Sequence, residues 1–393
     1  MKSWIAAGVL AVLAGSAGGQ DDPATLVRGY NAAGFRLFRE SWPADGNVVF
    51  SPYSIGAAMT MALAGARGET AAELARALDV EGVTNRLDAA QRDARAALLR
   101  STEQKGVQLR IANGLALAQH GDLIIEPFRA RVRDAYAAEI FAAPTPAEAN
   151  AWVERETDGR IKDLIKRYPP NCVAVLLNAI WFKGIWQRQF DPKLTQPGPF
   201  TLGDGTAVQA PTMRQTGEFA MVRNATMEAI ALPYEGGDLE MIFVLPPRGR
   251  PLSELETQLG AVFFEECRTA LSEAAPKRVR LSLPRFRMTV EAGLVPGFKK
   301  LGVVQAFSSS AADFGGMTGG QPGLIWIADI VHKAFIEVNE EGSEAAAATG
   351  VIMATRSAPP QEEVFSVDRP ALFFIAHRPT GAALFVGRLA DPR

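Results

Sequence analysis

The pattern of hydrophobic and polar positions divides the chain into a helix-rich first half and a strand-rich second half. Apolar residues at helical spacing predict helices over 22–42, 55–64, 69–78, 84–104, 125–137 and 147–168. Alternating or continuously apolar segments predict strands at 47–50, 107–118, 172–182, 227–232, 239–245, 278–286, 325–338 and 371–389. Such segregation is typical of an α+β domain and differs from the regular alternation of βα units.

The segment 172–182 is nearly all apolar, which is typical of a central strand covered on both faces. Neither a low-complexity linker nor a repeat period divides the chain after its first residues. The length of 393 residues would allow two domains. We nevertheless expect one large domain over residues 20–393.

The first residues have the features of a secretory signal peptide. Lys2 precedes an apolar run over 5–13, and small residues follow at 14–19. The run is too short to span a bilayer as a helix. We therefore expect a signal peptide at 1–19, a secreted or otherwise extracytoplasmic protein and no membrane partner. A buried N-terminal helix is the alternative interpretation.

Composition and charge exclude several functions. Hydrophobic residues make up 48% of the chain and the net charge is −2, which favours a globular protein with no nucleic-acid partner. Of the two cysteines, Cys172 and Cys267, we expect both to be free and buried, with a single bridge as the alternative. The three histidines belong to no motif of a hydrolase or metal site, so we expect no enzyme activity, metal or cofactor.

The segment 340–363 is unusual because about 20 residues with no strand pattern join two predicted core strands. Read with a period of two, one side carries no charge. That side consists of Ser343, Ala345, Ala347, Thr349, Val351 and Met353. The 15 residues from 342 to 356 would span roughly 50 Å as a strand. The segment could enter an existing sheet, but a partly helical loop or a flexible linker also fits these residues.

Several motifs, in order and along essentially the whole chain, resemble the serpin family. They are Asn47-Val-Val-Phe-Ser-Pro-Tyr-Ser-Ile55, Gly65-Ala-Arg-Gly-Glu-Thr70, Asn178-Ala-Ile-Trp-Phe-Lys-Gly184, the run from His332 to Ala345, Asp368-Arg-Pro370, Pro379-Thr-Gly381 and Phe385-Val-Gly-Arg388. The resemblance implies about nine helices around three β-sheets, with a large mixed central sheet. It also implies an exposed reactive-centre loop at about 341–363.

The resemblance further implies a suicide inhibitor of trypsin-like serine proteases that acts as a monomer. Counting 16 positions from the acidic residue Glu340 places the cleaved bond at Arg356–Ser357. Arginine suits the carboxylate in a trypsin-like specificity pocket. The hinge that would insert consists of Glu340, Glu341, Gly342, Ser343, Glu344, Ala345, Ala346, Ala347, Ala348 and Thr349. The alternative is a non-inhibitory serpin that acts as a protease substrate or binding module.

The same resemblance assigns gate residues to the central sheet. Ser51, Ser54, Asn178 and His332 would form a buried polar cluster where strands part. The alternative role of Ser51 and Ser54 is to cap a helix. At the top of the sheet, Glu340 would pair with Arg285, and Trp186 would lie beside them. An Arg-rich helix at 84–104 lies where some serpins bind glycosaminoglycans. Its interleaved acidic residues favour an ordinary solvated face instead.

Overall fold

The computed structural model describes residues 22–43, 45–102, 106–119, 121–343 and 362–393. These residues form nine α-helices and sixteen strands in three sheets. The helices are α1 (Asp22–Ser41), α2 (Pro52–Gly65), α3 (Gly68–Leu78), α4 (Leu87–Thr102), α5 (Glu126–Tyr136), α6 (Pro146–Glu156), α7 (Ser253–Gln258), α8 (Ala261–Glu273) and α9 (Val295–Lys300). The strands are β1 (Val48–Phe50), β2 (Val107–Leu117), β3 (Glu139–Ala142), β4 (Ala174–Ile185), β5 (Gln196–Thr201), β6 (Ala207–Phe219), β7 (Met221–Arg223), β8 (Glu228–Pro233), β9 (Leu239–Leu245), β10 (Lys277–Pro284), β11 (Phe286–Gly293), β12 (Ile327–Val338), β13 (Gly342–Ser343), β14 (Glu363–Ser366), β15 (Ala371–His377) and β16 (Ala382–Leu389).

The sheet that matters most for function, called here the main sheet, has the strand order β11-β12-β4-β2-β3, with the short β13 also paired to β4. Strand β4 lies at its centre, as the apolar run 172–182 predicted, and nearly all of its residues are buried. Its pairing with β12 is parallel, whereas its pairing with β2 is antiparallel. The expected mixed central sheet of an α+β fold is therefore confirmed.

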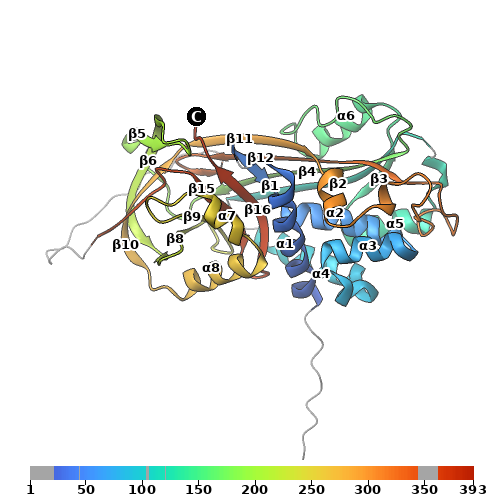
Figure 1. The fold of residues 1–393 in the computed structure, drawn as a ribbon, viewed down its shortest axis with the longest axis horizontal. Coiled ribbons are helices and arrows are strands. Elements are labelled where there is room, and N and C mark those ends of the chain that lie inside the picture. Colours follow the sequence, from blue (N-terminus) through green and yellow to red (C-terminus); the bar gives the residue numbers. More distant parts are fainter. Residues whose placement is uncertain (1–21, 44, 103–105, 120, 344–361) are drawn as a thin grey trace, which may run out of the picture.

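Two further sheets complete the molecule. One has the order β1-β16-β15-β9-β8-β7, and its strands β9, β15 and β16 are buried along their whole length. The other has the order β14-β10-β6-β5 and lies at one end of the molecule (Figure 1). Strand β14 joins this end sheet by parallel pairing with β10. The two strands that flank the segment 344–361 therefore belong to different sheets.

Helices cover both faces of the main sheet (Figure 1). On one face α2 packs against β2 and β4, and all of its residues are buried. A helix that is apolar on every side must be enclosed on every side, so α2 becomes the centre of the helical layer. On the opposite face α6 packs against β2 through a separate apolar cluster that includes Trp152.

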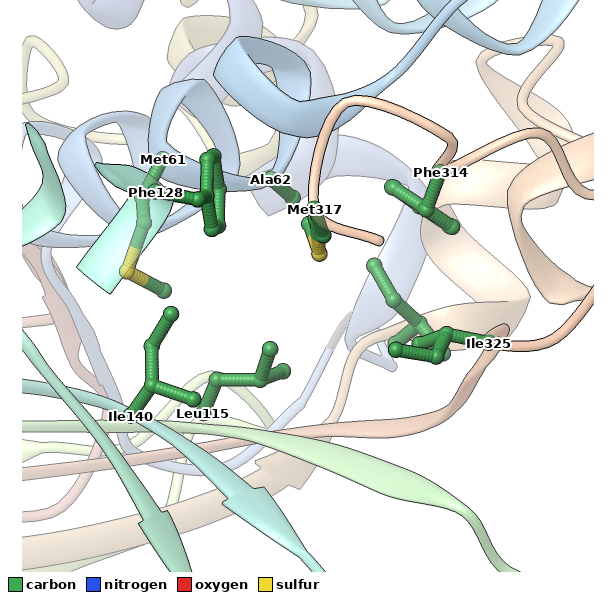
Figure 2. Close-up of a pocket in the computed structure, with 9 residues that line it drawn as sticks. Met61, Ala62, Leu115, Phe128, Ile140, Phe314, Met317 and Ile325 are labelled. Atoms are coloured by element: carbon green, nitrogen blue, oxygen red, sulfur yellow. The ribbon is translucent and has the colours of Figure 1, made fainter. Parts of the chain in front are cut away.

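Figure 2 shows the packing between the helical layer and the main sheet at its β3 end. Side chains from α2, α5, β2, β3 and the segment before β12 point toward one another around a void of about 10 Å³. Its walls are Met61, Ala62, Leu115, Phe128, Ile140, Phe314, Met317, Ile325 and Ile327. A space of this size with apolar walls offers no partner to a water molecule, so the layer is close-packed and dry.

Two details differ from the pattern-based expectation. The helix predicted over 147–168 ends at Glu156, because Asp158 and Gly159 adopt positive φ angles of 51° and 76° and end the helical run. The strand predicted over 278–286 divides at Arg285 into β10 and β11, which join different sheets. The hydrophobic pattern does not predict these breaks, because they depend on backbone conformation and not on which residues are buried.

Both cysteines are free and buried, as expected. Burial raises the pKa of the Cys172 thiol to about 11 and that of Cys267 to about 12. Thiols with such high pKa values carry little thiolate at neutral pH and are unreactive.

The close contact between β15 and β16 gives a test of the packing. A methyl group on Gly387 would overlap the ring of Phe373 on the paired strand, where both residues are buried. We expect Gly387→Ala to lower the free energy of unfolding by about 1–3 kcal/mol, because overpacking forces the neighbours apart. Urea unfolding measures this change.

Gly203→Ala is the matched control, because nothing lies within 4 Å of a methyl group placed there. The control should change stability by less than about 0.5 kcal/mol. Equal stability of the two variants would contradict the packing at Gly387.

Candidate functional site

The main sheet changes its pairing at one end of β4. Strand β12 pairs with β4 only as far as Phe335, opposite Trp181. Beyond that point the chain turns back, and β13 lies antiparallel to β4, with Gly342 opposite Ile185 and Ser343 opposite Gly184. We call this place, formed by the turn 339–342 and the end of β4, the entry point.

The turn at the entry point has strict backbone requirements. The side-chain Oδ1 of Asn339 accepts the backbone N–H of Glu341 at 3.1 Å and that of Gly342 at 3.3 Å. Gly342 has a φ of 146°, and a Cβ atom there would overlap the backbone of Gly184. Only glycine combines that φ with so close an approach to β4.

Trp186 closes the entry point, beside which it was expected. Its indole Nε1 donates to the carbonyl of Asn339 at 3.0 Å, and its backbone N–H donates to the carbonyl of Glu341 at 2.8 Å. The indole stacks on Tyr234 with a centroid separation of 4.5 Å and an interplanar angle of 10°. One side chain thus connects the turn to the sheet that contains β8 and β9.

Glu340 anchors the turn on its other side. Its carboxylate Oε1 accepts the Thr195 hydroxyl at 2.7 Å and lies 3.6 Å from Nη1 of Arg285. Its carbonyl accepts the backbone N–H of Phe190 at 2.8 Å. The structure therefore places Glu340 and Arg285 together as an ion pair, in which Glu340 is buried and Arg285 is half-exposed.

A buried polar cluster lies under the middle of the main sheet. It contains Ser51, Ser54, Asn178 and His332, which were expected together, and also Asn113. Asn178 Nδ2 donates to Ser54 Oγ and to Asn113 Oδ1, both at 2.6 Å. Ser51 Oγ accepts the backbone N–H of Ser54 at 3.1 Å and so caps α2.

The hydrogen bonds of the cluster determine the tautomer of His332. Its Nδ1 lies 2.5 Å from Asn178 Oδ1, and its Nε2 lies 3.3 Å from the backbone nitrogen of Ser51. Since Oδ1 can only accept and a backbone N–H can only donate, the proton is on Nδ1 and Nε2 is the acceptor. Burial lowers the pKa of His332 to about 3, so the ring is neutral at physiological pH.

The cluster forms a row across the main sheet. Asn113, Asn178 and His332 occupy paired positions on β2, β4 and β12. The bond between His332 and Asn178 therefore crosses the boundary between β4 and β12, and Ser51 and Ser54 attach the row to α2 below. Any strand that entered between β4 and β12 would break that bond.

The remaining candidate residues have different outcomes. Glu344, Ala345, Ala346, Ala347, Ala348, Thr349, Arg356 and Ser357 lie outside the described residues. Asn113, Thr195 and Tyr234 were not found from the sequence. Only Asn113 left a signal there, as a polar residue within an apolar strand. Thr195 and Tyr234 are ordinary residues that tertiary folding brings to the entry point.

Part of the charge on the Arg-rich segment 84–104 is engaged with other residues. Arg86 pairs with Asp22 at 3.0 Å, and Arg95 donates to the carbonyl of Asp134 at 3.3 Å. Asp88 on the same helix binds Arg131. Among the described residues, no group of three or more His, Cys, Asp or Glu could hold a metal ion. Within the same ranges, the helices are too short or too polar to cross a membrane.

Comparison with known proteins identifies the family. The model of the serpin (serine protease inhibitor) family matches residues 28–392. An uncharacterised serpin-like protein of Thermococcus kodakarensis is 37% identical over 95% of this chain and 87% of its own length. The leukocyte elastase inhibitor of Bos taurus is 36% identical over 91% of this chain and 96% of its own length.

A solved structure agrees with this result. Native protease nexin-1, crystallised with heparin, has a TM-score of 0.81 and 30% identity and covers 94% of this chain and 99% of its own. The chain belongs to the serpin family. Members of this family are generally protease inhibitors and not catalysts.

The buried imidazole of His332 predicts a pH dependence of stability. The folded-state pKa of about 3 lies below the ordinary value of 6.5, so the unfolded chain binds the proton more readily. The contribution of His332 to the free energy of unfolding is fully present above pH 6.5 and is lost as the pH falls toward 3. Relative to His332→Gln, we expect the wild type to lose about 2 kcal/mol of unfolding free energy between pH 7 and pH 5.

Urea unfolding of both proteins at the two pH values measures this difference. Groups other than His332 titrate in both proteins and cancel in the comparison. A difference between wild type and variant that stays constant with pH would show that His332 titrates normally in the folded protein.

Proposed function

We propose that this protein is a suicide-substrate inhibitor of trypsin-like serine proteases, cleaved at Arg356–Ser357. The protease serine attacks the carbonyl carbon of Arg356, the amide nitrogen of Ser357 leaves with a proton, and an acyl-enzyme ester remains. Insertion of the released hinge into the main sheet then traps that ester before water hydrolyses it. The protein supplies a substrate bond and stored free energy and is itself no enzyme.

The observation that carries this proposal is the antiparallel register of β13 on β4. Because Gly342 lies opposite Ile185 and Ser343 opposite Gly184, each later residue would lie opposite one residue earlier in β4. Continuing this register would pair 342–353 with 185–174, the whole length of β4. The inserted strand would end three residues before Arg356, with the attached protease at the far end of the sheet.

The same register assigns the side chains of the inserted strand to faces. Ala345, Ala347, Val351 and Met353 would lie beside Phe182, Ile180, Leu176 and Ala174, which belong to the main core. Thr349 would lie beside Asn178 in the polar cluster. Glu344 would lie on the opposite face, beside Lys183. The uncharged side of the hinge thus matches the core, and its one charge meets a cation.

Insertion would require β4 and β12 to separate along their whole pairing, from Ala174 opposite Ile327 to Trp181 opposite Phe335. It would exchange that one parallel ladder for two antiparallel ladders and would break the bond between His332 and Asn178. The gain in ladder hydrogen bonds and apolar burial favours the inserted state. The polar cluster and the entry point oppose separation until cleavage releases the loop.

The proposal also includes the location of the protein, its domain organisation and its target class. The signal peptide at 1–19 would direct the protein out of the cytoplasm, with residues 20–393 as a single domain that acts as a monomer. The relative named as an elastase inhibitor supports the inhibitory class. Arg356 favours a trypsin-like target, because its guanidinium can pair with the carboxylate of a trypsin-like specificity pocket.

Incubation with trypsin tests the cleaved bond. We expect a covalent complex that survives SDS electrophoresis, together with a C-terminal fragment that begins at Ser357. Arg356→Ala should abolish the complex because alanine lacks the cation that pairs with the pocket carboxylate. Arg356→Lys should retain inhibition, since lysine carries the same charge.

Complex formation by Arg356→Ala at the wild-type level would show that another bond is cleaved. Cleavage of the wild type without any complex would show a non-inhibitory serpin that acts as a substrate.

A pair of neighbouring substitutions tests the inserted register. Ala347→Glu would place a carboxylate against Ile180 in the core, where it has no partner, and should divert the protein from inhibitor to substrate. A cost above 1.4 kcal/mol reduces the yield of complex by more than ~10-fold. Gel quantification of complex against cleaved protein gives this ratio.

Ala346→Glu is the matched control, one residue away on the opposite face. In the proposed register it lies beside Trp181, where the guanidinium of Arg160 is 5.4 Å from the indole centroid. This variant should keep most of the inhibition. An equal loss in both variants would argue against the assigned faces.

A further inference from the structure

The end sheet has a solvent-facing surface where β6, β10 and β14 lie side by side. The register of these strands places Arg280 of β10 between Thr216 of β6 and Val364 of β14. The neighbouring rows on the same face join Glu218 with Arg278, and Arg214 with Ser282 and Ser366. None of these residues is buried, whereas the alternate residues Val279, Leu281 and Phe365 are buried. The three rows therefore form a surface, called here the outer face, that is open to solvent.

Arg280 lies at the centre of the outer face with uncharged neighbours on both sides. One of them, Val364, is a hydrophobic residue with 42% of its surface exposed. In the described part of the chain, no ion pair or side-chain hydrogen bond engages the guanidinium of Arg280. Arginine is enriched among the residues that contribute most to protein–protein binding, and an exposed valine beside it adds apolar area. The centre of the outer face thus offers a free cation next to an apolar contact.

The charges on the outer face are unevenly distributed. Arg278 pairs with Glu362, just before β14, at 3.4 Å and lies opposite Glu218 on β6. Both glutamates therefore flank the same arginine. Arg214 donates to the carbonyl of Thr212 at 3.4 Å and has no acidic partner among the described residues. The excess positive charge lies on Arg280 and Arg214, so this part of the face suits a partner with negative surface charge.

The outer face also lies close in sequence to the bond of the proposed function. Glu362 is five positions after Ser357, so the chain between them spans at most about 18 Å. A folded domain of about 220 residues, the size of a small protease, has a radius of gyration of about 17 Å. A protease bound at Arg356 would therefore be large enough to extend over the outer face.

We propose that the outer face is a docking surface for the same protease that cleaves Arg356–Ser357, an inference that rests on the proposed function. Arg280 would pair with a carboxylate on the protease surface beside the active-site cleft, and Val364 would pack against the protease next to that pair. Arg356 would then select the specificity pocket. Arg280 would select, among proteases with the same pocket, those with an acidic surface, chiefly by speeding association.

Two trypsins of the same specificity and opposite net charge, one anionic and one cationic, test this docking surface. The measured quantity is the second-order rate constant for loss of the intact protein, with covalent complex and cleaved protein counted together. At low ionic strength we expect the wild type to react faster with the anionic trypsin, although its own net charge of −2 would favour the cationic one. The difference should shrink at high salt, because exposed charges are screened.

Arg280→Glu should lower the rate constant with anionic trypsin by ~10-fold or more at low ionic strength, because it places like charges opposite each other. Its rate constant with cationic trypsin should not fall. Arg280→Lys should keep most of the wild-type rate, since it keeps the charge. Arg92→Glu is the matched control, because it changes the net charge equally at an exposed position on α4, among the helices and away from the end sheet (Figure 1). This control should react as the wild type does.

Thermal midpoints show whether each variant is folded, and Arg280→Gln replaces Arg280→Glu if the latter is not. The docking surface is overturned if the folded Arg280 variant reacts with anionic trypsin at the wild-type rate, or if Arg92→Glu lowers that rate equally. Cleavage at Arg356 without any covalent complex would contradict the proposed inhibition alone, because the cleavage rate still reports docking. Absence of cleavage at Arg356 by either trypsin would overturn both proposals.

Discussion

The structure depends on one boundary, the parallel pairing between β4 and β12 at the centre of the main sheet. Parallel ladders are slightly less stable per residue than antiparallel ones, and this ladder is bordered at one end by a turn that already presents an antiparallel strand. The bond between His332 and Asn178 holds the middle of the boundary, and the contacts of Trp186 and Glu340 hold its end. These contacts hold β4 and β12 together along the boundary at which, in the proposed function, the hinge would insert.

Buried polar groups suit this task because their energetics depend strongly on their partners. While Asn178, His332 and Ser54 bond one another, the cluster is satisfied and the sheet is well ordered. If the strands moved apart by a small distance, the same groups would lie in a low-dielectric interior without partners, which is costly. If the boundary between β4 and β12 were purely apolar, a small separation of the two strands would cost less free energy. The polar row thus favours the closed sheet over a partly opened one.

Sequence patterns predicted much of this arrangement because burial leaves a direct mark on composition. The apolar run 172–182 predicted a central strand covered on both faces, and β4 is that strand. The small uncharged residues before Arg356 predict a segment able to enter a sheet, and most of that segment lies outside the described residues. Asn113 could have been recognised as a polar residue in an apolar strand. Thr195 and Tyr234 could not, because their roles depend on which distant segments lie beside β4. The end of α6 was also missed, because it depends on local φ angles and not on hydrophobicity.

The sequence by itself determined the α+β class, the family and the chemistry of the hinge, since each follows from the order and type of residues along the chain. The tertiary structure decided the register of β13 on β4, the tautomer of His332 and the pairing of Glu340 with Arg285 and Thr195. These relations join residues far apart in sequence. Distances and hydrogen-bond geometry set them, and both exist only when the chain has folded.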